Sequence, residues 1–189
     1  MTTKDQKYLL RLARRTIDKY LQNKNIIQLE DSELTKTLLD KRATFVTLEK
    51  NHNLRGCIGD LEPQKSLYQS VIDNSLASAF LDPRFPPVKE DELKDIVIEI
   101  SILSPLKKLP QFNSLTDFLQ YLNNKKPGLF IKKGSLQATF LPQVWEELPN
   151  PQGFLNQLCL KAGLEPNEWQ NLNLEMFEYK VEKFKDTQY

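Results

Sequence analysis

The sequence predicts an α+β fold in which a mainly antiparallel sheet is flanked by helices. Residues 66–81 repeat apolar side chains at the spacing of a helix. Ile96–Leu103 places isoleucine at alternate positions, as a strand does. The polar run Lys50–Asn53 has turn composition and separates two extended segments. Helices combined with strands that double back through tight turns are typical of this fold class.

The helices expected in the first half of the chain follow from apolar spacing. Residues 5–22 have one apolar face and one face rich in Lys and Arg, which is typical of a solvated surface. A short helix is expected around Leu34–Leu39, with Asp31 or Ser32 as its N-cap. The helix at 66–81 must end at the proline-rich run that follows it, because proline lacks a backbone donor and restricts the residue before it.

The strands expected in the first half form a hairpin and an interior strand. Ala43–Glu49 is rich in β-branched and aromatic residues, and Leu54–Ile58 would return antiparallel to it. In Ile96–Leu103 the isoleucines fill one face, and the other face carries Val97, Glu99, Ser101 and Leu103, so the strand is expected to be buried on both sides. A buried carboxylate at Glu99 would then need a cationic or hydrogen-bonding partner.

A smaller unit is expected to begin near Pro105 and Pro110. Its expected elements are a helix near Leu115–Leu122, a hairpin formed by Gly128–Lys132 and Ser135–Phe140, and a helix near Phe154–Ala162 that ends at Gly163. The chain then returns to strand at Leu172–Phe184, where apolar positions switch from even to odd numbers. An extra residue near Met176 and Phe177 would restore one apolar face, so we predict a β-bulge there.

The composition excludes some classes of function. Lys and Arg number 26 and Asp and Glu 25, so a net charge of +1 provides no extended field for a nucleic acid. The N-terminal residues are polar, and no apolar run is long enough to span a bilayer, which predicts a cytoplasmic protein. Cys57 and Cys159 are then expected to be free thiols, and with the single His52 they are too few for a structural zinc site. We expect no metal and no cofactor.

The segment Leu54–Gly59 is the most chemically suggestive part of the chain. In a regular strand its first and fifth residues would face the core, while Arg55 and Cys57 would share the other face, roughly 7 Å apart. A guanidinium at that range favours the thiolate, which is the nucleophilic form of cysteine. The alternative is that Cys57 is a small buried hydrophobe and that Gly56 and Gly59 only permit close packing.

Other side chains are also candidates, each with a structural alternative. Asp82 and Arg84 would line a ligand cleft or would form an ion pair that organises their loop. Glu99 would act as a general acid or base, or would be held in a salt bridge to Arg55 or Arg84. Trp145 would line a ligand pocket or anchor a core. His52 lies in a predicted turn, where it is expected to be exposed.

Leu54-Arg55-Gly56-Cys57-Ile58-Gly59 closely resembles the hallmark of the AMME chromosomal region (AMMECR) proteins, known in prokaryotes as AmmeMemoRadiSam system protein A. The resemblance extends over nearly the whole chain through further strings in the same order, Asp82–Pro87, Ile98–Ser101, Leu141–Glu146, Leu158-Cys159 and Lys161–Leu164. It implies one continuous AMMECR domain with a larger α+β lobe at 1–110 and 169–189 and a smaller inserted lobe at 111–168. It places the motif near the junction of the lobes.

The residues and the resemblance leave two classes of function open. The first is an enzyme or ligand-binding protein that uses Cys57, Arg55 and Glu99, with Gly56, Gly59, Asp82, Arg84 and Trp145 as ligand-binding residues, in a cleft between the lobes. The second is a non-catalytic partner or regulatory protein that uses the motif as a docking surface. The prokaryotic family name implies a functional link with a Memo-type protein and a radical S-adenosylmethionine enzyme. Nucleic-acid modification or binding is a third hypothesis, and the charge balance argues against it.

Overall fold

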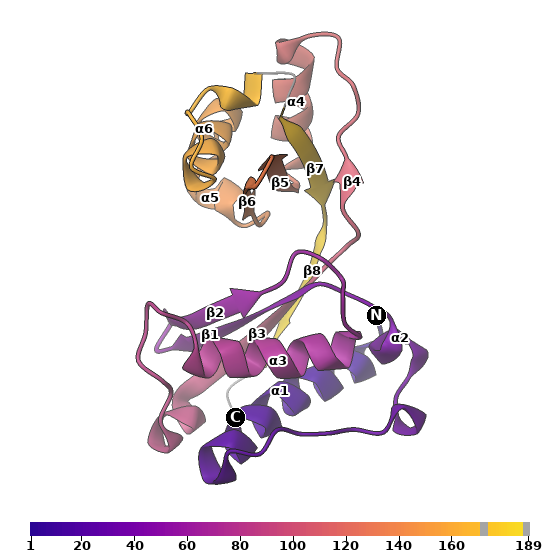
Figure 1. The fold of residues 1–189 in the computed structure, drawn as a ribbon, viewed down its shortest axis with the longest axis vertical. Coiled ribbons are helices and arrows are strands. Elements are labelled where there is room, and N and C mark those ends of the chain that lie inside the picture. The colour runs from indigo at the N-terminus through magenta and orange to yellow at the C-terminus, as the bar shows by residue number, and fades with distance from the viewer. Residues whose placement is uncertain (171–173, 187–189) are drawn as a thin grey trace. The chain divides into compact units, whose positions relative to one another are not determined.

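A computed structural model describes residues 1–170 and 174–186, which form two compact units with an antiparallel four-stranded sheet in each. The first unit comprises Met1–Leu103 and the segment from Glu182 onward, and the second comprises Ser104–Val181. Their elements are labelled in Figure 1. The predicted α+β class is confirmed.

The sheet of the first unit has the strand order β2-β1-β3-β8. Its strands are β1 (Thr44–Lys50), β2 (Asn53–Gly59), β3 (Ile96–Leu103) and β8 (Val181–Lys185). β1 and β2 form the predicted hairpin, and its turn residues Asn51 and His52 have φ angles of 52° and 62°. Two positive φ angles in a two-residue loop give the turn twist that matches a hairpin. β3 is an interior strand, as predicted.

Two helices cover one face of this sheet, as Figure 1 shows. The helices of the unit are α1 (Thr3–Asn23), α2 (Lys36–Leu39) and α3 (Leu67–Phe80), with 3₁₀ turns at Asp31–Glu33 and Glu90–Asp95. α1 and α3 form the cover, and α1 begins with a capping box between Thr2 and Asp5. The predicted cap of the short helix was wrong, because Asp31 and Ser32 form a separate turn and Thr35 precedes α2.

Strict alternation along β1 and β3 sorts their side chains between the two faces. Val46, Leu48 and the isoleucines of β3 face the helices and form the core of the first unit. Thr47 and Glu99 are paired in register and lie on the opposite face. We call the face that carries Val46 and Leu48 the helix face, and the face that carries Thr47 and Glu99 the second face.

The second unit has its own sheet and core. Its strands are β4 (Lys107–Lys108), β5 (Gly128–Lys133), β6 (Leu136–Phe140) and β7 (Glu175–Tyr179), in the order β4-β7-β5-β6. Its helices are α4 (Leu115–Lys125), α5 (Val144–Glu147) and α6 (Pro151–Lys161), with a 3₁₀ turn at Glu168–Gln170. Gly163 follows α6 with a φ of 78°, the left-handed conformation that commonly ends a helix.

The β-bulge predicted at Met176 and Phe177 was wrong. β7 pairs with β5 in unbroken register from Gly128 opposite Tyr179 to Lys132 opposite Glu175. The apolar positions switch from even to odd numbers because both faces of β7 make apolar contacts. Met176 packs on the core of the second unit, while the Phe177 ring lies against Phe130 on the other face, with 6.0 Å between ring centroids.

The part of the chain that the structure describes contains no helix that is both long enough and apolar enough to cross a membrane.

Candidate functional site

A β-bulge in β2 separates the two residues that we expected to act together. Cys57 pairs with Thr47 and Gly56 with Leu48, but the next pair joins Leu54 to Glu49, so Arg55 has no opposite residue. The extra residue reverses the alternation, and Leu54 is 44% exposed on the face of Cys57 instead of buried in the core. The expectation that Arg55 and Cys57 share a face was therefore wrong.

The Arg55 side chain is committed to Glu92. Arg55 Nε donates to Glu92 Oε1 at 3.2 Å and Nη2 donates to Oε2 at 3.0 Å, and Lys50 Nζ lies 3.0 Å from Oε1. Lys50 belongs to the helix face by alternation, so the guanidinium lies on that side of the sheet. The bond from Arg55, together with Lys50 and the backbone of Lys89, lowers the pKa of Glu92 to about 2 against the opposing effect of burial. Arg55 thus joins β2 to the 3₁₀ turn at Glu90–Asp95.

Gly56 allows α3 to lie against the hairpin, and Gly59 allows the end of β2 to lie close to β1. A Cβ atom at Gly56 would lie 2.2 Å from the carbonyl oxygen of Ser78, and one at Gly59 would lie 2.3 Å from that of Thr44. Ser78 Oγ accepts from Ile58 N at 2.8 Å and donates to Val46 O at 2.7 Å. Both glycines thus serve the packing of the first unit.

Asp82 and Arg84 hold the backbone of Cys57 at the open edge of β2. Cys57 N donates to Asp82 Oδ2 at 2.8 Å, and Arg84 Nη2 donates to Cys57 O at 3.2 Å. The two side chains also bond each other, with Arg84 Nε donating to Asp82 Oδ1 at 2.9 Å and Nη2 to Oδ2 at 2.7 Å. The Arg84 bond holds the pKa of Asp82 well below its usual range although the carboxylate is buried. The pair closes an edge that would otherwise be free to pair with another strand.

Replacing Asp82 with Asn should lower the free energy of unfolding of the first unit by about 2 kcal/mol, because a buried, charge-assisted acceptor is lost. The pKa of Asp82 is depressed, so its contribution is present above its ordinary value of 3.8 and is lost as the pH falls below it. Hydrogen exchange of the β2 amides at pH 7 and pH 3 measures both effects. Arg84→Ala should cost less, because 55% of that side chain is exposed. Equal costs at both pH values in the Asp82 variant would contradict this account.

A row of polar side chains crosses the second face of the sheet. Thr47 Oγ1 donates to Cys57 Sγ at 3.3 Å, and Glu99 lies beside Thr47 in register on β3. Glu99 is only 3% exposed, and its Oε2 lies 2.9 Å from Nζ of Lys183 on β8. Glu99 therefore has the partner that burial required, but that partner is neither Arg55 nor Arg84. We call Cys57, Thr47, Glu99 and Lys183 the polar row.

The remaining sequence candidates lie outside this row. Trp145 is a buried core residue of the second unit, stacked on Phe154 with 3.8 Å between ring centroids, and its Nε1 donates to Pro127 O. Cys159 is buried in the same core, and burial raises the pKa of its thiol. Both cysteines are free, which confirms the prediction that they form no disulfide. His52 is exposed in the hairpin turn, as predicted.

The polar row combines a half-buried thiol beside a hydroxyl donor with a buried carboxylate that pairs with a half-exposed lysine. The Thr47 hydroxyl orients the thiol of Cys57, and the Glu99–Lys183 pair offers both signs of charge. Among the described residues no cluster of three or more His, Cys, Asp or Glu side chains is placed to hold a metal ion. Sequence analysis missed Thr47 and Lys183. The alternation of β1 placed Thr47 on this face, but nothing local linked Lys183 to Glu99.

Comparisons with known proteins agree over nearly the whole chain. A family model described as AMMECR1 matches residues 10–184. Protein MK0488 of Methanopyrus kandleri is 34% identical over 194 residues, covering 98% of this chain and 90% of that protein. Protein Mbar_A1807 of Methanosarcina barkeri is 36% identical over 191 residues, covering 98% and 93%. The crystal structure of an uncharacterized protein, PH0010 from Pyrococcus horikoshii, has a TM-score of 0.85 and 33% identity, covering 95% of this chain and 90% of that one.

Proposed function

This chain belongs to the AMMECR1 family, as its motifs indicated, and we propose that it binds a small polar ligand over the polar row of its first sheet, with Cys57 in contact with that ligand. The observation that carries the proposal is the buried carboxylate of Glu99, paired with Lys183 on a sheet face that also holds Cys57. Burying a carboxylate costs free energy, and a contact with one half-exposed lysine offsets only part of that cost, so we infer that Glu99 has a role in binding.

The contacts of the row favour binding at Cys57. Its backbone is fixed on both sides by Asp82 and Arg84, and its thiol is oriented by Thr47. Cys57 is half-buried, and 47% of the Lys183 side chain is exposed. A ligand that reaches both would meet a soft nucleophile and a cation on a rigid sheet, and fixed side chains of this kind give a binding site its specificity. Any chemistry at this site would depend on the Cys57 thiolate.

A panel of cysteine-reactive fragments tests the proposal, with labelling of the native full-length chain followed by mass spectrometry. Cys57 should be labelled and the buried Cys159 should not. After correction for each fragment's rate with glutathione, the labelling rates at Cys57 should spread by at least tenfold, because recognition precedes reaction. Lys183→Met should reduce the spread for acidic fragments. Lys185→Met is the matched control, because it removes an exposed lysine on the same face of the same strand that has no bond to Glu99.

Two outcomes would count against a ligand site. Rates that follow intrinsic fragment reactivity would show that Cys57 is accessible but recognises nothing. A Cys57 that reacts only on unfolding would be a packing residue. The docking hypothesis would then take precedence, and it has one observation in its favour, the 44% exposed Leu54 on the same face. For that case we propose a Memo-type protein or a radical S-adenosylmethionine enzyme as the partner, which the family resemblance supports.

A further inference from the structure

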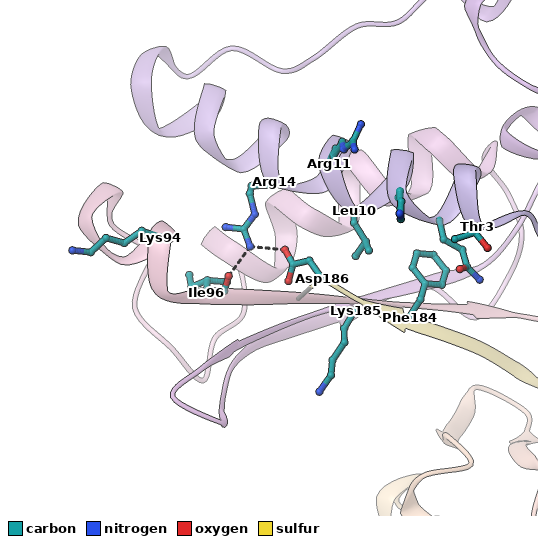
Figure 2. A pocket seen from close by; sticks show the side chains of 11 residues that line it. Thr3, Leu10, Arg11, Arg14, Lys94, Ile96, Phe184, Lys185 and Asp186 are labelled. Atoms are coloured by element: carbon teal, nitrogen blue, oxygen red, sulfur yellow. Dashed lines mark hydrogen bonds and ion pairs between the residues drawn. The ribbon is translucent and has the colours of Figure 1, made fainter. Parts of the chain in front are cut away.

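A cavity of about 570 Å³ opens beside α1 in the first unit, where β8 forms an edge of the sheet (Figure 2). Its lining comes from α1, from the segment that leads into β3, and from β8. This volume is in the range of small-molecule pockets. The cavity is distinct from the polar row, because Phe184 and Asp186 alternate with Lys183 along the chain and point to the helix face. We call it the α1–β8 groove.

The floor of the groove is apolar. Leu10 of α1 and Phe184 of β8 are half-buried and pack against the core of the first unit. Ile96, at the start of β3, is fully buried and also lines the cavity. An apolar floor of this kind favours a ligand with a hydrocarbon body over a free inorganic ion.

One end of the groove holds a fixed guanidinium. Arg14 Nη1 donates to Leu93 O at 2.9 Å, and its Nη2 donates to Ile96 O at 2.6 Å and pairs with Asp186 at 2.5 Å. Figure 2 shows Arg14 reaching from α1 to Ile96 and Asp186. The other oxygen of Asp186 accepts from Ile98 N at 2.7 Å, so this carboxylate is already used by the sheet. Arg14 therefore sets the shape of the groove and leaves little net negative charge there.

The mouth of the groove is basic. Lys7 and Arg11 lie one turn apart on α1, are exposed, and form no ion pair within residues 1–170 and 174–186. Both also line a neighbouring hollow of about 390 Å³, together with Thr3, Lys4 and Tyr8. Lys94 and Lys185 line the cavity too, at the end where Arg14 lies, and Figure 2 shows their side chains pointing away from it. Figure 2 also shows Arg11 on the outer side of α1 from Leu10, so its guanidinium lies at the rim of the groove and not over the floor.

We propose that the α1–β8 groove binds a small amphiphilic oxyanion, an organic phosphate or carboxylate with a short apolar body. The apolar body would lie on Leu10 and Phe184, and the oxyanion would be held at the mouth by Lys7 and Arg11. Two cations without acidic partners beside an apolar floor match this class, because each part of the ligand finds its complement. Cys57 takes no part in this groove, so a test of ligand binding here is independent of the test of the polar row.

Nuclear magnetic resonance titration of the ¹⁵N-labelled full chain with hexyl phosphate tests the proposal, with inorganic phosphate and hexylamine as comparison probes. Hexyl phosphate should shift the amides around Leu10 and Phe184 and bind at least tenfold more tightly than inorganic phosphate. Hexylamine should not bind there. The double variant Lys7→Glu/Arg11→Glu should weaken hexyl phosphate binding at least tenfold. Its matched control, Arg15→Glu/Lys19→Glu, makes the same charge change on the same helix away from the cavity and should stay within twofold.

The same spectra report whether each variant is folded, so a loss of binding can be distinguished from a loss of structure. If both double variants weakened hexyl phosphate binding equally, the binding would depend on the overall charge of the protein and not on Lys7 and Arg11. That result would overturn the proposal. The same holds if hexyl phosphate binds no better than inorganic phosphate, since the apolar floor would then have no role. Sodium hexanoate in place of hexyl phosphate then distinguishes a carboxylate ligand from a phosphate ligand.

Discussion

Replacing Gly56 with alanine should lower the free energy of unfolding of the first unit by about 3 kcal/mol. The added methyl would lie 2.2 Å from the carbonyl oxygen of Ser78, which belongs to the backbone of α3. A backbone atom in a packed helix cannot move aside as a flexible side chain does, so α3 must shift away from β2. That shift would lengthen the bond from Ile58 N to Ser78 Oγ, now 2.8 Å, as a second loss. Hydrogen exchange of β1 and β2 peptides measures the change directly.

Gly153→Ala is the matched control for this substitution. Gly153 lies in α6, and a Cβ atom there would have no neighbour closer than 3.9 Å. Alanine favours a helix over glycine by about 0.5 kcal/mol or more, so the second unit should be unchanged or slightly stabilised. A Gly56→Ala variant within 0.5 kcal/mol of the natural chain would show that α3 is not held tightly against the hairpin.

Structural features that follow from the spacing of apolar residues along a short segment were predictable from the sequence. The alternating isoleucines of β3 and the turn at Asn51 and His52 gave the strand, its faces and the hairpin, because each signal lies within a few neighbouring residues. The helix over 66–81 was correct for the same reason, and α3 spans Leu67–Phe80. Pairing between distant segments was not available from such signals.

The error at Arg55 shows why the candidate site was harder to predict than the fold. Strand parity assumes one residue opposite each residue of the partner strand, and the bulge that breaks this rule exists only in the pairing of β1 with β2. Once Arg55 is displaced, its partner becomes Glu92, from a turn far along the chain. The ion pair of Glu99 with Lys183 has the same origin, because it requires β8 to return beside β3. The sequence predicted the strand that carries the motif but not the faces on which Leu54 and Arg55 lie.

Removing the Arg55 guanidinium should destabilise the first unit without direct effect on Cys57. Arg55→Met leaves Glu92, only 17% exposed, without its bidentate partner, and breaking such a pair costs about 3 kcal/mol. Arg55→Lys should recover only part of this loss, because an ammonium does not reproduce the two-pronged contact. One buried guanidinium nitrogen, Arg55 Nη1, has no hydrogen-bond partner within the described residues, so the arginine itself is not ideally satisfied.

The same pair gives a pH dependence of known sign. The pKa of Glu92 is lowered to about 2 from an ordinary value of 4.5. A depressed carboxyl pKa stabilises the fold fully above the ordinary value, and the contribution is lost as the pH falls from about 4.5 through about 2. With allowance for solvent screening the loss should be about 2 kcal/mol. Glu92→Gln should lower stability at pH 7 and flatten the profile over this window.

The double variant Arg55→Met/Glu92→Leu separates a structural role from a chemical one. Replacing both charges with apolar side chains removes the unpaired carboxylate and the unsatisfied nitrogen together, so stability should return to within about 1 kcal/mol of the natural chain. Because Arg55 lies on the helix face and Cys57 on the second face, fragment labelling of Cys57 should keep its rate and selectivity in this variant. A stable double variant in which labelling falls more than threefold would show that Arg55 acts on the thiol. Our assignment of Arg55 to the fold would then be wrong.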